Sequence, residues 1–301
     1  MDINILNTFF KGFVVTQNKK CIEKFKGRTS FKSYDEVKEL PEFAGILAED
    51  AVVFDFDDPE QAECAFNIVK GLDLKCAVIK TTRGKHILLK NDGEIKSNKI
   101  HTRLACGLTC DIKVGCRNSY AILKFDNKER TVERNITEGE EYQTEPVFFS
   151  PMKISKTEEG NWNIWNLSEG EGRNQALYNY ILKLQDYFSV DEIRDIYRTV
   201  INPYVLKEPL SDDELDVILR DESFQKVSEK KGFSFSDFGD RMIHDFNMKR
   251  INDQLHIYRD GIYISNVRYI ENAMLQINKI NAAKRNEVLK YLDITILDDT
   301  S

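Results

Sequence analysis

Two carboxylates stand two residues apart in a short apolar run, Val53-Phe54-Asp55-Phe56-Asp57. Successive side chains of a β-strand point to opposite faces, so Asp55 and Asp57 share one face and the two phenylalanines share the other. Carboxylates at the end of a buried strand repel each other unless a proton or a cation neutralises them. Mg²⁺ or Mn²⁺ fits such oxygen ligands, and a pair of these ions can serve a phosphoryl transfer. The alternative is a strand that runs into an acidic helix start at Pro59.

A histidine follows a basic turn in the run Thr81-Thr82-Arg83-Gly84-Lys85-His86. Glycine allows the backbone to approach a ligand closely, and Arg83, Lys85 and the N–H groups of the turn can bind phosphate oxygens. The imidazole of His86 can donate to a phosphate as well. The alternative is a structural strand histidine. Combined with the carboxylates, the turn predicts a site for a metal and a triphosphate.

A further carboxylate and a lysine occur in the run Asp111-Ile112-Lys113. Both side chains share one strand face, so Asp111 is a candidate third metal ligand and Lys113 a candidate phosphate ligand. The alternative is an ordinary cross-strand ion pair.

Zinc is a competing candidate, because one histidine and three cysteines are close in sequence. The cysteine spacing C-x₃-C-x₅-C differs from the close pairs of structural zinc sites, which argues against zinc. Half-buried strand cysteines are the simpler interpretation. The residues concerned are His101, Cys106, Cys110 and Cys116.

Charge is distributed unevenly along the chain. The formal net charge is -7, yet residues 18–33 hold six basic residues against one acid, and residues 75–103 hold eight against two. Local basic surfaces of this kind can bind phosphates whatever the net charge, although solvated surface is the simpler explanation of either patch alone. No apolar run reaches the ~18 residues of a membrane span. The absence of a secretory signal and the irregular spacing of the six cysteines predict a cytoplasmic protein with reduced thiols.

The pattern of elements predicts an α+β fold. Residues 1–150 indicate one domain with a mostly antiparallel sheet, in which residues 110–114 and 120–125 form a strand pair. Residues 151–168 are polar and predict a linker or an edge hairpin. Apolar residues then recur at helical spacing, which predicts a small helical domain over residues 169–228. Residues 232–301 indicate a further module with two helices and a hairpin at residues 255–264.

The residues Asp55, Asp57, His86 and Asp111, in this order, resemble the three motifs of the archaeo-eukaryotic primase superfamily, in its primase-polymerase branch. Gly172-Arg173-Asn174 at a helix start resembles the helical C-terminal domain of phage and prophage primases. Residues from about 232 onward resemble the segment that precedes a superfamily 3 helicase in longer relatives. The resemblance thus covers nearly the whole chain.

This resemblance implies a catalytic domain with an RRM-like core, followed by the helical primase domain and an accessory module. It implies a two-metal site for Mg²⁺ or Mn²⁺ and a grip on the incoming nucleotide. The chain has no helicase phosphate loop, so it is either a separate primase or a piece of a primase-helicase, with a helicase as partner. The implied metal ligands are Asp55, Asp57 and Asp111, the nucleotide ligands Arg83, Lys85, His86 and Lys113, and the template or initiation residues Arg117, Arg173 and Asn174.

The expected activity is primer synthesis from nucleoside or deoxynucleoside triphosphates on single-stranded DNA, in phage or mobile-element replication inside a bacterial host. Two alternatives remain open. A metal-dependent nuclease or phosphodiesterase uses the same carboxylates without a triphosphate. A non-catalytic replication module binds single strands or recruits a helicase.

Overall fold

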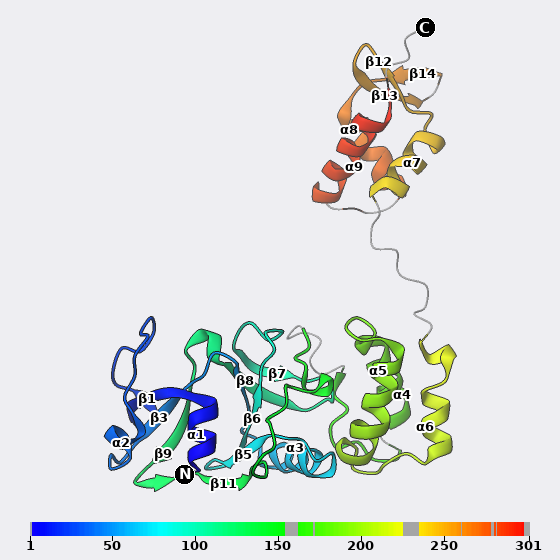
Figure 1. The fold of residues 1–301 in the computed structure, drawn as a ribbon. Coiled ribbons are helices and arrows are strands. Elements are labelled where there is room, and N and C mark those ends of the chain that lie inside the picture. Colours follow the sequence, from blue (N-terminus) through cyan, green and yellow to red (C-terminus); the bar gives the residue numbers. More distant parts are fainter. Residues whose placement is uncertain are drawn as a thin grey trace. The chain divides into compact units, whose positions relative to one another are not determined.

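The chain folds into two compact units, Met1–Phe224 and Gln225–Ser301 (Figure 1). Both units combine helices with antiparallel strands, which confirms the predicted α+β class. The structure, a computed structural model, describes residues 2–153, 162–170, 172–224, 235–259, 261–277, 280 and 282–297.

The first unit contains a five-stranded sheet in the order β10-β9-β3-β1-β2, with every pair antiparallel. Two short helices, α1 (Ile3–Phe9) and α2 (Tyr34–Val37), contact its strand β1. The strands are β1 (Phe10–Gln17), β2 (Lys20–Cys21), β3 (Phe43–Leu47), β9 (Tyr120–Phe125) and β10 (Lys128–Glu129).

The same unit contains a six-stranded sheet in the order β11-β5-β6-β4-β8-β7, again antiparallel throughout. Helix α3 (Pro59–Gly71) follows β4 directly, with Asp58 as its N-cap and proline at its first position. The strands are β4 (Ala51–Phe56), β5 (Ala77–Lys80), β6 (Lys85–Lys90), β7 (Lys99–Arg103), β8 (Thr109–Val114) and β11 (Thr131–Arg134).

The predicted pairing of residues 110–114 with 120–125 is wrong, because β8 pairs with β4 and β9 pairs with β3. A 3₁₀ turn, η1 (Gly115–Arg117), and the left-handed Asn118 carry the chain from one sheet to the other. This crossing packs tightly against the β3–β4 connection, since a Cβ on Gly115 would lie 1.6 Å from the carbonyl oxygen of Ala48. A turn that looks local in sequence is therefore a crossover between sheets.

Strand β4 separates two hydrophobic cores. Ala51 and Val53 pack with the first sheet in one core, whereas Phe54 and Phe56 pack with α3 in the other. The alternation predicted for this strand is therefore present. Asp55 lies on the same face of β4 as Ala51 and Val53. This face is apolar in the core between the two sheets and becomes polar at Asp55, where that core ends and the cavity begins.

The helical segment after the sheets shares the core on the α3 side. Tyr180 and Ile181 belong to the same cluster as Phe54, and the span predicted as a linker adds Met152 and Ile164 to it. Residues 154–161 of that span lie outside the described residues. The helices predicted over 169–228 are thus present, but they complete the first unit. They are α4 (Arg173–Leu184), α5 (Val190–Ile196), the π-helix η4 (Tyr197–Val205), α6 (Asp212–Ile218) and the 3₁₀ turns η2 (Val147–Phe149) and η5 (Asp221–Phe224).

The second unit has a three-stranded antiparallel sheet, β12-β13-β14, and three helices among its described residues. The predicted hairpin is present as β13 and β14, and its turn residue Asp260 lies outside the described residues. Ile257, Met274 and Leu292 are central to a separate core. The elements are α7 (Phe235–Asp245), β12 (Lys249–Ile251), β13 (Gln254–Arg259), β14 (Ile262–Ile264), α8 (Val267–Ile277) and α9 (Ala282–Thr295).

None of the helices in the described parts of the chain is both long and apolar enough to span a bilayer.

Candidate active site

Asp55 lies between two strands that each bring one candidate residue. In the register of the second sheet it pairs with His86 of β6 on one side and with Asp111 of β8 on the other. Directly paired residues of an antiparallel sheet project from the same face. Three residues from three separate sequence motifs therefore stand in one row across the sheet.

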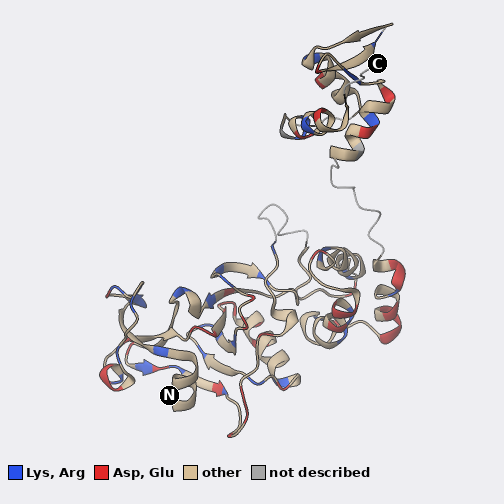
Figure 2. Cartoon of the chain, turned by 45° about the horizontal axis from the view of Figure 1, so that its top comes forward, with Lys and Arg blue, Asp and Glu red and all other residues tan. Residues whose placement is uncertain are grey.

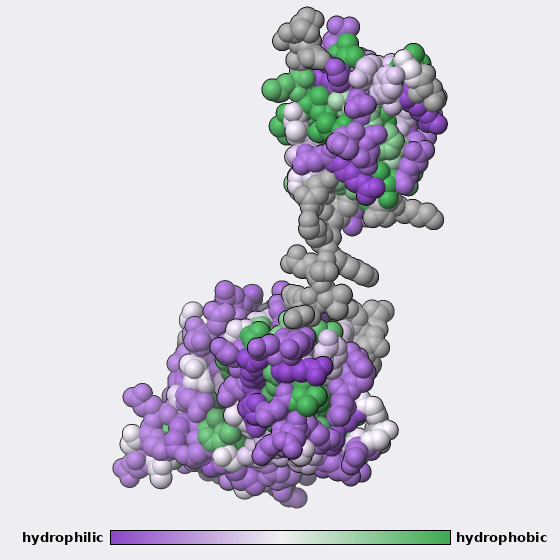
Figure 3. Space-filling view, turned by 90° about the vertical axis from the view of Figure 1, so that its right-hand side faces the viewer, coloured by the Kyte–Doolittle hydropathy of each residue, from purple (hydrophilic) through white to green (hydrophobic). Residues whose placement is uncertain are grey.

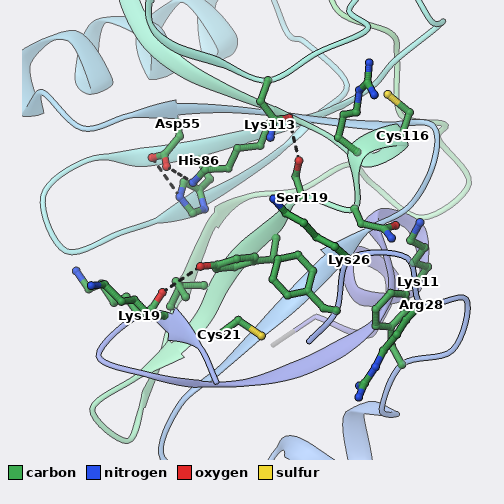
Figure 4. A pocket seen from close by; sticks show the side chains of 18 of the residues that line it. Lys11, Lys19, Cys21, Lys26, Arg28, Asp55, His86, Lys113, Cys116 and Ser119 are labelled. Atoms are coloured by element: carbon green, nitrogen blue, oxygen red, sulfur yellow. Dashed lines mark hydrogen bonds and ion pairs between the residues drawn. The ribbon is translucent and has the colours of Figure 1, made fainter. Parts of the chain in front are cut away.

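Two basic side chains hold the Asp55 carboxylate. Its Oδ1 lies 3.2 Å from Nε2 of His86, and its Oδ2 accepts a 2.6 Å hydrogen bond from Nζ of Lys113 (Figure 4). Burial alone raises the pKa of this carboxyl, but the hydrogen bonds and charges of His86 and Lys113 outweigh it and hold the pKa well below its usual range. Asp55 is therefore ionised, and its neighbours already balance its charge.

Asp57 continues the same face just beyond the end of β4. Its side chain is exposed and lines a large cavity. The next residue, Asp58, accepts a 2.9 Å hydrogen bond from the backbone N–H of Gln61 at the start of α3. The acidic helix start is therefore made by Asp58, and Asp57 faces the cavity.

Asp111 lies in the same row but has a different partner. Its Oδ1 accepts a 2.7 Å hydrogen bond from the backbone N–H of His101, and it is not among the residues that line the cavity. Among the described residues, no three His, Cys, Asp or Glu side chains are grouped to hold a metal ion. The structure thus brings Asp55 and Asp57 to the cavity and leaves Asp111 beside it.

The turn before His86 is closed by its own hydrogen bonds. The N–H of Gly84 donates to Oγ1 of Thr81 at 3.0 Å, and the N–H of Thr81 donates to the carbonyl of Gly84 at 2.9 Å. A Cβ on Gly84 would lie 1.7 Å from the carbonyl oxygen of Phe56. Glycine is therefore needed for the approach of this turn to the end of β4, a structural role in place of the predicted contact with a ligand. Arg83 at the tip lines the cavity.

Lys85 lies on the opposite face of the sheet from His86. It forms ion pairs with Glu133 and, at 3.3 Å, with Glu63, and its Nζ lies 4.6 Å from the ring centre of Phe66. Adjacent strand residues point in opposite directions, so Lys85 and His86 do not face the same ligand. The expected contact of Lys85 with a nucleotide does not fit this placement.

The cavity has a volume of about 1540 Å³ and lies between the row of Asp55 and the first sheet. Lys19, Lys26 and Arg28 come from the segment around β2 and stand across it from Asp55 and His86 (Figure 4). Nine basic side chains line the cavity against three acidic ones, so it attracts anions. The basic residues are Lys11, Lys19, Lys20, Lys26, Arg28, Arg83, Lys113, Arg117 and Arg130, and the acidic ones are Glu49, Asp55 and Asp57.

The charge of the first unit is segregated. Figure 2 shows basic residues along the β1–β2 region and acidic residues gathered on α6, whose first turn holds three acids. The basic wall also contains two aromatic rings, Phe25 and Tyr120, in edge contact at 5.3 Å. Aromatic rings among cations are typical of surfaces that bind single-stranded nucleic acid.

Arg130 is a cavity residue that motif reasoning did not single out. It precedes β11, donates a 3.0 Å hydrogen bond to Oγ1 of Thr82, and has a buried Nε without a hydrogen-bond partner. Burial lowers the pKa of its guanidinium, while the charge of Asp55 raises it. The only sequence signal is its place in the basic stretch after β9, because the contact with Thr82 depends on long-range pairing.

The three residues implied for template or initiation contacts separate in the structure. Arg117 lines the cavity and donates from Nε to the carbonyl of Lys96 at 3.2 Å. Arg173 is buried in the helical segment, where it donates to the carbonyl of Glu208 at 2.7 Å and pairs with Glu214 at 3.3 Å. It thus fastens the start of α4 to the start of α6. Asn174 is exposed on α4 and does not line the cavity.

The cysteines considered for zinc occupy different environments. Cys106 and Cys110 belong to the core on the α3 side, and burial raises the pKa of the Cys106 thiol to about 12. Cys116 is exposed and lines the cavity.

The cavity therefore combines an ionised carboxylate, a second exposed carboxylate, a buried histidine and a wall of cations. Comparisons of the chain with protein-family models, with curated proteins and with solved structures found no match.

Proposed function

We propose that this protein is a nucleotidyltransferase of the primase type, which synthesises primers on single-stranded DNA inside the cavity of its first unit. One observation carries the proposal: Asp55, Asp57 and His86 meet at a cavity lined by nine cations. A triphosphate and a template backbone are both polyanions, and both need such a surface.

The two walls of the cavity bind different substrates, the nucleotide and the template. Arg83, Lys113 and Arg130 lie on the side of Asp55 and bind the triphosphate. The wall of Lys19, Lys26 and Arg28 binds the template backbone, and Phe25 and Tyr120 stack on bases.

His86 orients the phosphates from its place beside Asp55. Its Nε2 faces Asp55, and its buried Nδ1 has no hydrogen-bond partner. When both ring nitrogens carry a proton, both can donate hydrogen bonds. In that form Nδ1 donates to a phosphate oxygen.

The carboxylates of Asp55 and Asp57 fit a divalent cation by donor chemistry, because both offer oxygen ligands from one strand face. When bound, Mg²⁺ or Mn²⁺ supplies positive charge to the reacting phosphate. Lys113, which donates to Asp55, would be available to phosphate if a cation took its place there. Asp111 joins these ligands only if its bond to the His101 backbone breaks.

One feature of the topology supports this proposal. Strand β4 precedes α3, and β5, β6 and β8 follow it; in the sheet these four strands lie in the order β8-β4-β6-β5, as in an RRM-like core. An RRM-like core has a second helix before its last strand, whereas the described residues 91–108 contain strand β7 at that place. We extend the proposal to a replicative helicase as partner, in trans or in a longer form of the chain.

A second function is favoured by two contacts of Asp55. Lys113 and His86 already neutralise Asp55, so the site is stable without a catalytic cation. A module that binds single strands or nucleotides without reaction uses the same cavity and cations.

A primer assay separates these functions. The full chain is incubated with single-stranded DNA, labelled nucleotides and Mg²⁺ or Mn²⁺, and the products are sized. We expect products that lengthen with time. Shortening of the template supports a nuclease instead, and DNA binding without any change in length supports the non-catalytic module. Ribonucleotides and deoxynucleotides in parallel reactions identify the preferred substrate.

A further inference from the structure

The three-stranded sheet of the second unit has one buried and one outward face. Leu255, Ile257 and Ile264 point into the core of that unit. The alternate residues of the same strands point the other way. The outward face is therefore defined by Lys249 of β12, His256 and Tyr258 of β13, and Tyr263 of β14.

Two tyrosines stand side by side on this outward face. Tyr258 and Tyr263 are direct cross-strand partners, their ring centres lie 5.2 Å apart, and 44% and 37% of their surfaces are exposed. Figure 3 also shows hydrophobic side chains in green at the surface of this unit, but the tyrosines are not among them, because tyrosine is slightly hydrophilic on the scale used. Two partly exposed rings in contact thus give this face a continuous aromatic surface.

Basic side chains continue the row of tyrosines. Lys249 pairs with His256 in the sheet register, and His256 is two residues from Tyr258 on the same face. The Nδ1 of His256 lies 2.8 Å from the carbonyl oxygen of Gln254, so this nitrogen donates and Nε2 points elsewhere. None of the four residues of the face is acidic. The face thus combines flat aromatic surface with positive charge.

We propose that this outward face binds single-stranded nucleic acid. Unpaired bases stack on Tyr258 and Tyr263, and the backbone phosphates contact Lys249 and, when it is protonated, His256. Stacking on exposed aromatic rings beside cations is a general means of holding single strands without sequence preference. A duplex does not present its base faces, so it binds more weakly. This site is independent of the reaction proposed for the first unit.

The test uses the full chain and a single-stranded oligonucleotide with iodouracil bases. Irradiation crosslinks these bases to stacked aromatic rings, and peptide mapping then locates the crosslinks. We expect crosslinks at Tyr258 or Tyr263. Affinity is measured in a Lys26→Ala/Arg28→Ala background, which weakens the cavity of the first unit. There, Tyr258→Ala/Tyr263→Ala lowers affinity by about tenfold or more.

Three controls make the result specific. Tyr258→Phe/Tyr263→Phe keeps both rings and retains binding. Tyr187→Ala removes a ring of equal exposure from the first unit and leaves these crosslinks unchanged. Lys249→Glu/His256→Glu reverses the charge and weakens binding with both rings intact. Crosslinks confined to the first unit, equal binding of duplex, or unchanged affinity of the alanine variant overturns the proposal. Primer synthesis by the first unit is scored separately, so failure of either proposal is recognisable.

Discussion

Each face of the six-stranded sheet holds one buried charged side chain, and the two side chains differ in what surrounds them. On the face toward α3, Lys85 is 7% exposed and enclosed by Glu63 and Glu133. On the face toward the first sheet, Asp55 is 8% exposed and paired with His86 and Lys113, but it borders a cavity. Burial alone does not distinguish a structural ion pair from a functional one. What distinguishes them here is access to a space that a ligand can fill.

The largest effect is expected on the apolar side of β4. Phe54→Ala removes a fully buried ring and should lower the free energy of unfolding by about 3–5 kcal/mol. Asp57→Ala, on the exposed end of the other face, should leave it nearly unchanged. Urea unfolding followed by tryptophan fluorescence reports the first unit, because both tryptophans, Trp162 and Trp165, lie there. Equal losses from the two variants would contradict the division between the faces.

The next effect separates the two lysines. Lys85→Ala removes the closer of the two lysines that pair with the half-buried Glu133 and leaves it only Lys80, at 3.7 Å. We expect this change to destabilise the first unit by about 2–3 kcal/mol, without changing the affinity for tripolyphosphate. Lys113→Ala should weaken tripolyphosphate binding several-fold, because it removes a cavity cation and uncovers the charge of Asp55. Both are checked by unfolding and by titration calorimetry. A loss of tripolyphosphate affinity in Lys85→Ala would place that lysine in the site.

The low pKa of Asp55 makes stability depend on pH in one direction. Its folded pKa lies below the unfolded value, so its contribution is present above about pH 4 and is lost as the pH falls further. Between pH 5 and pH 2, we expect the free energy of unfolding to fall by about 2 kcal/mol more in wild type than in Asp55→Asn. Unfolding curves at several pH values test this. Parallel pH profiles of the two proteins would show that the Lys113–Asp55–His86 contacts contribute nothing.

The smallest effect is expected at the basic wall opposite Asp55. Lys26→Ala/Arg28→Ala should weaken single-stranded DNA binding several-fold and reduce the slope of affinity against salt by about 1.4, from ~0.7 per lost phosphate contact. Lys70→Ala/Lys207→Ala removes two exposed cations outside the cavity and serves as the matched control. Fluorescence anisotropy at several salt concentrations measures both. The same slope for both double variants would exclude the wall as the DNA contact.

Strand parity accounts for what the sequence predicted correctly around β4. The alternation of Phe54 and Phe56 with Asp55 and Asp57 follows from the two-residue period of a strand and is present in the structure. The same rule, applied one strand further, separates Lys85 from His86. The signal for the true position of Lys85 was therefore in the sequence.

Long-range pairing accounts for what the sequence did not predict. The crossover at Gly115 depends on the carbonyl of Ala48, more than sixty residues earlier, and sends β9 into the other sheet. The Lys113–Asp55 contact and the Arg130–Thr82 contact depend on the same non-local register. No local sequence pattern predicts contacts between residues this far apart. The residues that line the cavity could therefore be identified only from the folded structure.

In the proposed reaction, the carboxylates at the end of β4 are required for nucleotide transfer. The most direct measurement is the rate of labelled nucleotide incorporation on single-stranded DNA by wild type, Asp57→Asn and Glu60→Gln. Asp57→Asn removes a carboxylate that faces the cavity, and Glu60→Gln makes the same change at an exposed position of α3. We predict at least a hundredfold loss in the first variant, with DNA binding intact, and no change in the second. Equal rates in all three proteins would show that Asp57 takes no part in nucleotide transfer.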